Sequence, residues 1–313
     1  MKIAVTGATG FVGQRLVEKL TLAGHEVRVL TRNPALAQRR FPAARFPQVV
    51  AIAIHPDRPE GWQQAILGCD GVVNLAGEPI AEKRWNETQK QEILQSRIKT
   101  TEQVVKAILQ GGTEPAAQAD SKPAVLVSAS AIGFYGTSET ASFDEDSPSG
   151  DDFLAEVCRQ WEAAAQPVTA SGTRLVILRI GIVVGNGGAI AKMLPAFWAF
   201  AGGPIGTGQQ WFSWIYREDL VDLIIQALTD GQMSGTYNAT SPNPVRMKTV
   251  AEVMGNVLGR PSWLPVPGFA LDLLLGEGAK VVLEGQQVLP KRTQVSGFQF
   301  QFPDLAAALK DFL

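Results

Sequence analysis

The chain has 313 residues and a formal net charge of −2, with 45% hydrophobic and 19% charged residues, as expected for a globular enzyme. So small a charge provides no field for nucleic acid or an anionic membrane, and no run approaches the roughly 18 apolar residues of a membrane-spanning helix. Two cysteines are too few for a disulfide framework, and two histidines with scattered acids give no metal site.

The first predicted element is a strand at 2–6, followed by the segment Thr6-Gly-Ala-Thr-Gly-Phe-Val-Gly13 and a helical pattern. A strand at the start leaves no room for a signal peptide, so we expect a cytoplasmic protein. Strand, glycine loop and helix form the context that a dinucleotide-binding fingerprint requires, although glycine-rich turns also occur without a ligand. Gly7 can make the tight turn, Gly10 lets the backbone approach a pyrophosphate, and Gly13 allows close packing of helix on strand. The predicted contacts of this loop with the cofactor are Gly7, Thr9, Gly10, Phe11, Val12 and Gly13.

The strand expected at 26–32 indicates which dinucleotide is bound. A site for NAD usually carries an acid near the end of this strand, about 20 residues past the glycines, which holds the ribose 2′-hydroxyl. Thr31 and Arg32 stand there instead, and the planar guanidinium suits a 2′-phosphate that a carboxylate would repel. We therefore predict NADP(H) as the cofactor, with Thr31 and Arg32 among its contacts; a solvated surface arginine is the alternative.

Strands and helices continue to alternate as far as residue 181. The spacing predicts strands at 49–54, 71–76, 124–128 and 174–180, helices at 61–67, 85–109 and 152–165, and a loose connection at 111–123. Helices of this length between strands imply right-handed crossovers and parallel strands. We predict an α/β fold with a Rossmann-type doubly wound parallel sheet.

After residue 181 the pattern changes. Glycine-rich segments at 185–188 and 202–208 flank a helix expected at 191–200, and a helix at 218–228, a strand at 235–239, a Pro-rich segment at 261–267 and an apolar helical stretch near 269–284 follow. We predict that residues 1–181 and 213–240 form the NADP-binding Rossmann domain. Residues 182–212 and 241–313 should form a small discontinuous C-terminal lobe over the carboxyl edge of the sheet, where ligands bind in such folds.

Further motifs carry a specific resemblance. They are Asn74-Leu-Ala-Gly77, Arg84-Trp-Asn-Glu87, Ser128-Ala-Ser-Ala-Ile-Gly-Phe-Tyr-Gly136, Trp161-Glu162, Gly202-Gly-Pro-Ile-Gly206, Trp214-Ile-Tyr-Arg-Glu-Asp219, Leu283-Glu-Gly-Gln286 and Gly297-Phe-Gln-Phe300. With the glycine loop, they make the chain resemble extended short-chain dehydrogenases/reductases. It is most similar to the atypical subgroup known as epimerase-family proteins of unknown substrate, some of which carry a cell-division-inhibitor label. The resemblance implies cofactor contacts at Leu75, Ala76, Gly77, Glu78, Arg84 and Glu162.

The chain departs from this family where the acid–base residues are expected. Dehydrogenases and epimerases of this type use a tyrosine that transfers a proton and a lysine four residues on that lowers the pKa of the phenol. When Glu162 sets the alignment, Leu154 and Cys158 occupy these positions, and shifting the frame by one residue restores neither group. We expect Cys158 to be a small buried apolar residue rather than a nucleophile. Arg97 stands where relatives often have the asparagine that anchors a relay water.

Two hydroxyls remain as catalytic candidates. Ser130 is the counterpart of the family's catalytic serine, although a serine at a strand end is equally suited to capping a turn. Tyr135 in the same loop is the second candidate. Glu78 and Glu162 are implied to hold the nicotinamide ribose, or to act as a base if burial raises the pKa. Arg84 is implied to reach a phosphate, with a solvated arginine as the alternative.

Two functions of different classes stay open. The first is an NADP(H)-dependent oxidoreductase or epimerase that acts on a small polar or sugar-like molecule with altered acid–base residues. Ser130 and the aromatic second lobe favour it, and Trp211 and Trp214 are expected at its pocket or at a dimer face. The second is a non-catalytic NADP(H)-binding protein that senses the cofactor or scaffolds a protein partner, for example in cell division. Loss of the tyrosine and lysine favours this second function, and a homodimer is also left open.

Overall fold

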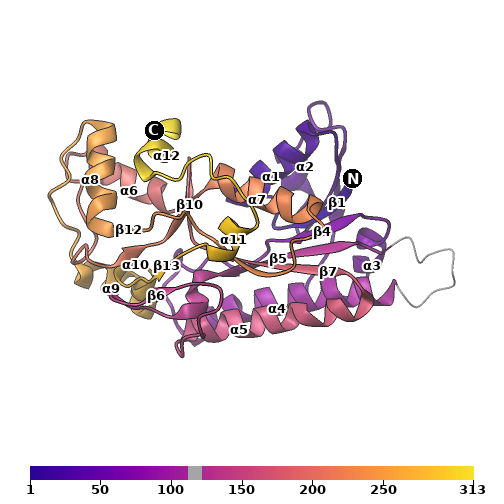
Figure 1. Ribbon diagram of the computed structural model, residues 1–313. Helices are drawn as coiled ribbons and strands as arrows, with labels where there is room; N and C mark the ends of the chain where they lie inside the picture. The colour runs from indigo at the N-terminus through magenta and orange to yellow at the C-terminus, as the bar shows by residue number, and fades with distance from the viewer. Residues whose placement is uncertain (112–121) are drawn as a thin grey trace.

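A computed structural model describes residues 1–111 and 122–313, and a single seven-stranded sheet forms its centre (Figure 1). The strand order is β11-β7-β5-β4-β1-β2-β3, and every neighbouring pair is parallel. The strands are β1 (Lys2–Thr6), β2 (Glu26–Thr31), β3 (Val49–Ala53), β4 (Gly71–Asn74), β5 (Val125–Ala131), β7 (Arg174–Ile180) and β11 (Gly235–Ala239). The predicted parallel doubly wound sheet is thus confirmed, and the strand expected at 235–239 does return to it. The connection expected at 111–123 lies almost wholly outside the described residues.

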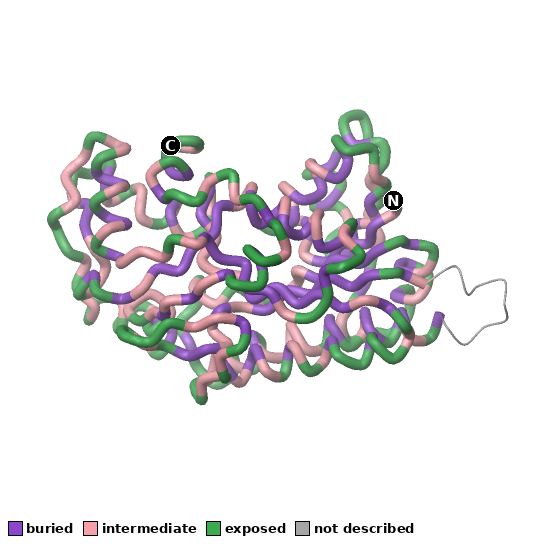
Figure 2. Tube along the Cα trace, in the orientation of Figure 1, coloured by how far each residue is buried: buried purple, intermediate pink, exposed green. Residues whose placement is uncertain are grey.

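Helices cover both faces of this sheet (Figure 1). One face carries α1 (Phe11–Leu22), α2 (Pro34–Arg40) and α7 (Arg217–Thr229), and the other carries α3 (Trp62–Ile66), α4 (Glu87–Gln110) and α5 (Phe153–Ala165). Because the sheet is enclosed on both sides, its central strands are nearly continuous runs of buried apolar residues (Figure 2).

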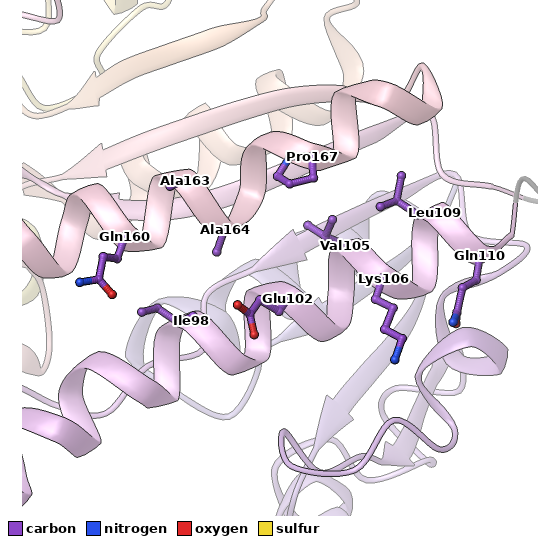
Figure 3. Close-up of a pocket in the computed structure, with 10 residues that line it drawn as sticks. All are labelled: Ile98, Glu102, Val105, Lys106, Leu109, Gln110, Gln160, Ala163, Ala164 and Pro167. Carbon is purple, nitrogen blue, oxygen red and sulfur yellow. The ribbon is translucent and has the colours of Figure 1, made fainter.

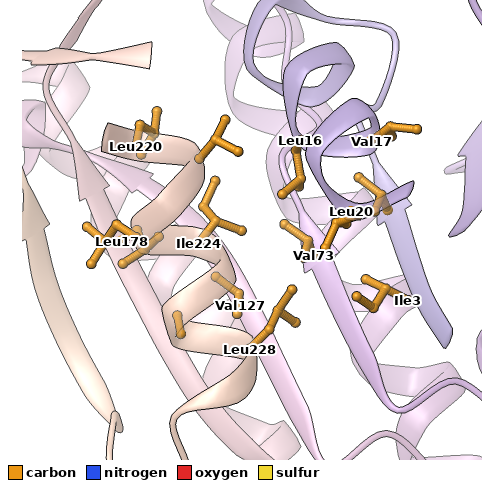
Figure 4. Packing of buried hydrophobic residues seen from close by; sticks show 14 of the residues in the cluster. Ile3, Leu16, Val17, Leu20, Val73, Val127, Leu178, Leu220, Ile224 and Leu228 are labelled. Carbon is orange, nitrogen blue, oxygen red and sulfur yellow. The ribbon is translucent and has the colours of Figure 1, made fainter. Parts of the chain in front are cut away.

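The core beneath α1 and α7 holds these two helices side by side on the sheet (Figure 4). Leu16 and Leu20 of α1 and Ile224 of α7 are fully buried there, together with Val73 of β4. Burial of each such side chain contributes roughly 1.5–3 kcal/mol to folding. The apolar spacing that predicted these helices therefore also fixes their place on the sheet.

Capped starts place α4 and α5 beside the carboxyl edge. The side chain of Asn86 accepts a hydrogen bond from the Gln89 backbone N–H at 2.8 Å, and Asp152 accepts one from Ala155 at 2.8 Å. Each cap satisfies a backbone donor that the first helical turn leaves unpaired. Farther along the two helices, Thr101 of α4 accepts a hydrogen bond from Asn74 at the end of β4, and Glu162 of α5 accepts one from Ser130 of β5.

The rest of the chain builds smaller sheets and helices beyond this edge. β8 (Ile182–Val184) pairs with β10 (Trp214–Tyr216), β9 (Trp211–Phe212) with β12 (Val245–Arg246), and β6 (Ser142–Phe143) with β13 (Gln287–Val288). A separate apolar cluster unites α6 (Gly188–Trp198), α8 (Met247–Leu258) and α12 (Leu305–Phe312). The remaining short elements are η2 (Ile132–Tyr135), η3 (Gln166–Ser171) and α11 (Lys291–Val295). The expected boundaries of the two lobes stay a prediction.

The apolar helical stretch expected near 269–284 consists of three successive helical pieces. They are α9 (Gly268–Leu275), the 3₁₀ turn η4 (Gly276–Ala279) and α10 (Lys280–Leu283). Gly276 adopts φ +60°, which ends α9 because glycine enters this conformation at little cost. Gly278 then packs on the indole of Trp85, where an added Cβ would lie 2.8 Å from the ring.

Candidate functional site

The glycine loop between β1 and α1 admits no larger residue at two positions. A Cβ on Gly7, whose φ is +69°, would lie 2.7 Å from the carbonyl carbon of Leu75. A Cβ on Gly13 would lie 2.3 Å from the carbonyl oxygen of Gly7. Gly10 donates its N–H to that same oxygen at 3.0 Å and precedes α1, which begins without a side-chain cap. The first N–H groups of α1 therefore face the edge of the sheet, as at anion-binding helix starts.

A first cavity of about 700 Å³ lies along the carboxyl ends of β2, β1 and β4. Nine of the predicted cofactor contacts line it, namely Gly7, Thr9, Gly10, Thr31, Arg32, Leu75, Ala76, Gly77 and Glu78. Arg32 is exposed at its rim, directly after β2. Asn33, the next residue, caps the start of α2, because its side chain accepts a hydrogen bond from the Leu36 backbone N–H at 3.0 Å. The Arg32 guanidinium is thus presented at the end of the cavity nearest α2.

Glu78 lies farther along the same cavity, after β4. Its carboxylate accepts a hydrogen bond from Lys83 Nζ at 2.7 Å, and this contact lowers the pKa of the Glu78 carboxyl. The backbone N–H of Glu78 donates to Ser96 Oγ at 3.0 Å. An ionised, anchored carboxylate is suited to accepting hydrogen bonds from hydroxyl groups and unsuited to holding a proton near neutral pH.

A second cavity of about 940 Å³ continues from the glycine loop toward β5 and the C-terminal segments. It shares Gly7, Gly10 and Leu75 with the first cavity, so the two form one trough along the edge of the sheet. The predicted site residues that line only this second cavity are Phe11, Val12, Gly13, Ser130, Tyr135 and Trp211. Together the two cavities have the size of a site for a dinucleotide and a small second molecule.

Ser130, near the end of β5, is tied to a buried ion pair. Its Oγ donates to Glu162 Oε1 at 2.7 Å. Arg179 of β7 binds both carboxylate oxygens of Glu162, with Nε–Oε1 at 2.8 Å and Nη2–Oε2 at 2.9 Å. The side chains of Arg179 and Glu162 are only 7% and 12% exposed, so this bidentate pair is largely removed from water. The pair orients the Ser130 hydroxyl, whose oxygen still has a lone pair for a group in the cavity.

Tyr135 lines the second cavity, but its hydroxyl is hydrogen-bonded to other side chains of the protein. Its hydroxyl donates to Asn238 Oδ1 at 2.7 Å and accepts a hydrogen bond from Arg179 Nη1 at 3.0 Å. The residue is buried, and burial raises the pKa of the phenol. The hydroxyl therefore both donates and accepts a hydrogen bond within the protein. The expected catalytic role of Tyr135 stays a prediction.

Comparison with known proteins identifies the family behind this geometry. The family described as NAD dependent epimerase/dehydratase matches residues 3–240. The chain belongs to this family. A second family, described as a domain of unknown function (DUF1731), matches residues 266–312, which include the broken helix α9 to α10.

Relatives of this epimerase-family chain match it over its full length. Epimerase family protein SDR39U1 homolog, chloroplastic, from Arabidopsis thaliana is 52% identical over 99% of this chain and 86% of its own length. Epimerase family protein YfhF from Bacillus subtilis is 40% identical over 100% of this chain and 98% of its own. The crystal structure of human epimerase family protein SDR39U1 (isoform2) with NADPH has a TM-score of 0.85 and 36% identity, covering 100% and 99% of the two chains. The resemblance to atypical epimerase-family dehydrogenases/reductases is confirmed.

The positions that the sequence analysis assigned to the family's tyrosine and lysine line the second cavity, and neither carries a phenol or an ammonium. Leu154 and Cys158 lie there on α5. The Cys158 thiol donates to the carbonyl oxygen of Ala131 at 3.5 Å, and burial, reinforced by the charge of Glu162, raises the pKa of the thiol to about 11. Cys158 is therefore protonated near neutral pH and is not a ready nucleophile.

Three residues singled out in the sequence do not line either cavity. Arg84 donates through Nη1 to the carbonyl oxygen of Leu273 at 2.7 Å, and Glu162 lies behind Ser130 in the ion pair. Their expected cofactor contacts stay predictions. Trp214 is fully buried and donates Nε1–H to the carbonyl oxygen of Asn243 at 3.0 Å, so its expected place at a pocket or dimer face is wrong.

The sequence analysis missed Arg179 and Asn238 as parts of the site. An arginine that follows the apolar run 175–178 inside β7 is the signal that could have revealed the first, because buried arginines are almost always paired. No local signal marks Asn238, because its partner Tyr135 lies 103 residues away in the sequence.

A separate groove lies on the outer surface between α4 and α5 (Figure 3). Ile98, Val105 and Leu109 of α4 face Ala163 and Ala164 of α5 across it. The groove is distant from the glycine loop and shares no lining residue with either site cavity. The homodimer or protein partner considered from the sequence stays a prediction.

Residues 1–111 and 122–313 contain no group of three or more potential metal ligands. Within the same ranges, no helix has both the length and the apolar composition that a membrane crossing requires.

Proposed function

We propose that the chain binds NADP(H) in the trough and acts as an oxidoreductase or epimerase on a small polar or sugar-like molecule. The observation that carries the choice of cofactor is the exposed Arg32 at the end of β2, the position at which an NAD site usually has an acid. The human relative whose structure contains NADPH supports the same choice.

In this proposal, different residues along the trough bind different parts of the cofactor. Arg32 binds the 2′-phosphate, the start of α1 binds the pyrophosphate, and Glu78 accepts hydrogen bonds from ribose hydroxyls. Bound NADPH supplies a hydride to an electron-poor carbon, and NADP⁺ accepts one in the reverse direction. Ser130 orients the oxygen on that carbon, while Glu162 and Arg179 hold the Ser130 hydroxyl in place.

The second candidate is a non-catalytic NADP(H)-binding protein that senses the cofactor or scaffolds a partner, with cell division as one setting. Leu154 and Cys158 favour it, because neither side chain transfers a proton near neutral pH. A panel of carbonyl metabolites assayed for NADPH oxidation separates the two. Turnover that falls in a Ser130→Ala variant supports the enzyme, whereas NADPH binding without any turnover supports the sensor.

The cytoplasmic location expected from the sequence belongs to this proposal as well. The Arabidopsis thaliana relative is designated chloroplastic, so imaging of the native chain in its own cell is the direct test.

The experiment that tests the cofactor assignment is a titration with NADPH and with NADH, followed by protein fluorescence. We expect tighter binding of NADPH, and Arg32→Ala should weaken it by about 10- to 150-fold because one charge-assisted contact is lost. Affinity for NADH should stay unchanged in this variant. Arg39→Ala, an exposed arginine of α2 outside both cavities, is the matched control and should bind both cofactors as the native chain does. Equal affinity of the native chain for NADPH and NADH would contradict the proposal.

A further inference from the structure

Arg97 occupies a confined position on the wall of the second cavity. It projects from α4, and its Cζ lies 5.2 Å from the ring centre of Trp161 on α5. A Cβ added to Gly77 would lie 3.0 Å from the same Cζ. The guanidinium is thus enclosed between the end of β4 and α5, and its position is defined by packing on both sides.

This cation has no acid partner among the described residues. Nη1 donates to the carbonyl oxygen of Ile93 at 2.8 Å, one turn earlier in the same helix, and Nε and Nη2 donate to no described group. Four acids nearby are bound elsewhere: Glu78 to Lys83, Glu162 to Arg179, Glu277 to Lys90, and Asp152 to the start of α5. Asp151, which lines the same cavity, forms no hydrogen bond or ion pair with Arg97. Burial lowers the pKa of Arg97, and the charge of Glu78 offsets this only in part, so removing the guanidinium from water has a net cost. An oxyanion in the cavity would offset that cost.

The order of the strands indicates which molecule brings the oxyanion. Along the edge, Arg32 follows β2, the glycine loop follows β1 and Gly77 follows β4, while Ser130 lies on β5, the next strand in the sheet. In the proposed function the phosphates of the cofactor are bound at β2 and β1. Arg97 lines the second cavity together with Ser130 and lies beyond these positions, so it is on the side of the trough that the proposed function assigns to the reacting molecule.

We infer that Arg97 is the receptor for an acid group, a carboxylate or a phosphate, carried by the substrate of this site. The inference rests on the proposed function and narrows its substrate class from polar molecules to anionic ones. The planar fork of a guanidinium matches both oxyanions, and the two free donors, Nε and Nη2, have the spacing for a bidentate contact. Partial removal from water strengthens such a contact.

Isothermal titration calorimetry with malonate and with inorganic phosphate tests this inference. Each anion is titrated into the full chain, both free of cofactor and saturated with NADP⁺, for the native protein and the variants Arg97→Gln, Arg97→Lys and Arg39→Gln. The native chain saturated with NADP⁺ should bind one anion, and Arg97→Gln should weaken this binding by at least about tenfold. Arg97→Lys should retain part of the affinity because it keeps the charge but loses the fork, and Arg39→Gln should match the native chain. Each anion should also raise the melting temperature of the native chain but not that of Arg97→Gln.

Three outcomes would overturn the inference. One is equal anion affinity in the native chain and in Arg97→Gln. Another is a pair of results found together: the anion no longer binds once the chain is saturated with NADP⁺, and Arg97→Gln weakens NADPH binding tenfold or more. Arg97 would then contact the cofactor and not the substrate. The third outcome applies if Arg97→Gln fails to fold. In that case, the inference is overturned if Arg97→Lys shows no detectable anion binding. If the native chain does not bind NADPH, the proposed function fails, and the titration without cofactor still decides whether Arg97 binds oxyanions.

Discussion

Cys158 lies on α5, at the position that the sequence analysis assigned to the family's lysine, and its environment gives it a different chemistry. The side chain is 3% exposed, and its thiol donates to the carbonyl oxygen of Ala131. Burial and the charge of Glu162 both disfavour the thiolate, which raises the pKa of the thiol to about 11. A group that ionises only at high pH cannot replace an ammonium that is charged at neutral pH.

The pH dependence of alkylation tests this description of Cys158. In a Cys69→Ser variant, which leaves Cys158 as the sole thiol, the rate of reaction with iodoacetamide should rise with pH toward a midpoint at about 11. Because the pKa of Cys158 is higher in the folded chain, its contribution to the free energy of unfolding is constant below the ordinary thiol pKa of about 8.5. Above that pH the contribution falls, because the thiol loses its proton in the unfolded chain before it does so in the folded chain. Mass spectrometry after timed quenching measures the rate. A midpoint below about 8.5 would contradict the account and indicate an activated thiol.

Single residues differ in how far the sequence alone predicts their roles. Arg32 and Ser130 could be placed because each follows or ends a strand that the apolar pattern predicts, and strand ends meet at one edge of a parallel sheet. Tyr135 was placed in the correct loop, but its hydroxyl contacts Asn238 and Arg179, which come from distant strands. Contacts between distant segments leave no local pattern in the sequence.

At the scale of secondary structure, the ion pair between Glu162 and Arg179 fastens α5 to β7 beside the site. Glu162→Gln removes one charge and leaves Arg179 buried without a counter-ion. We expect the free energy of unfolding to fall by about 3–5 kcal/mol, as when one partner of a buried pair is removed. Urea denaturation followed by circular dichroism measures this change.

Two further variants show whether the loss comes from the buried charge. Glu156→Gln removes an exposed carboxylate of the same helix, paired with Arg159, and should change stability by less than about 1 kcal/mol. Adding Arg179→Met to Glu162→Gln should restore part of the lost stability because no unpaired charge remains. A Glu162→Gln variant as stable as the native chain would show that the pair does not hold the two elements together.

The sequence predicts most strands of the sheet and most helices that cover it. It predicts the elements of the C-terminal segments only in part. The strands and the helices α1, α4, α5 and α7 were predicted within a few residues, because apolar spacing and turn residues mark them. The apolar run that becomes α9 and α10 was predicted only as a helical stretch, without its internal breaks. Its breaks depend on Gly276 and on contact of Gly278 with Trp85, nearly two hundred residues earlier in the sequence.

Across the whole molecule, the order of functional groups follows the order of the strands. Arg32, the glycine loop, Glu78 and Ser130 lie at the ends of β2, β1, β4 and β5, which are neighbours in the sheet. The C-terminal segments close on this edge, since a Cβ on Gly187 would lie 2.7 Å from the ring of Phe11. The cofactor half of the trough was therefore predictable from the local sequence. The other half was not, because Trp211, Lys280 and Gln286 reach it from segments far apart in the chain.

The central claim is that this edge holds NADPH with its 2′-phosphate at Arg32 and its nicotinamide toward Ser130. A crystal structure of the full chain with NADPH tests it most directly. The account predicts the 2′-phosphate within hydrogen-bond distance of Arg32, the pyrophosphate at the start of α1, and the nicotinamide in the second cavity. A 2′-phosphate away from Arg32, or a nicotinamide at the end of the trough nearest α2, would contradict it.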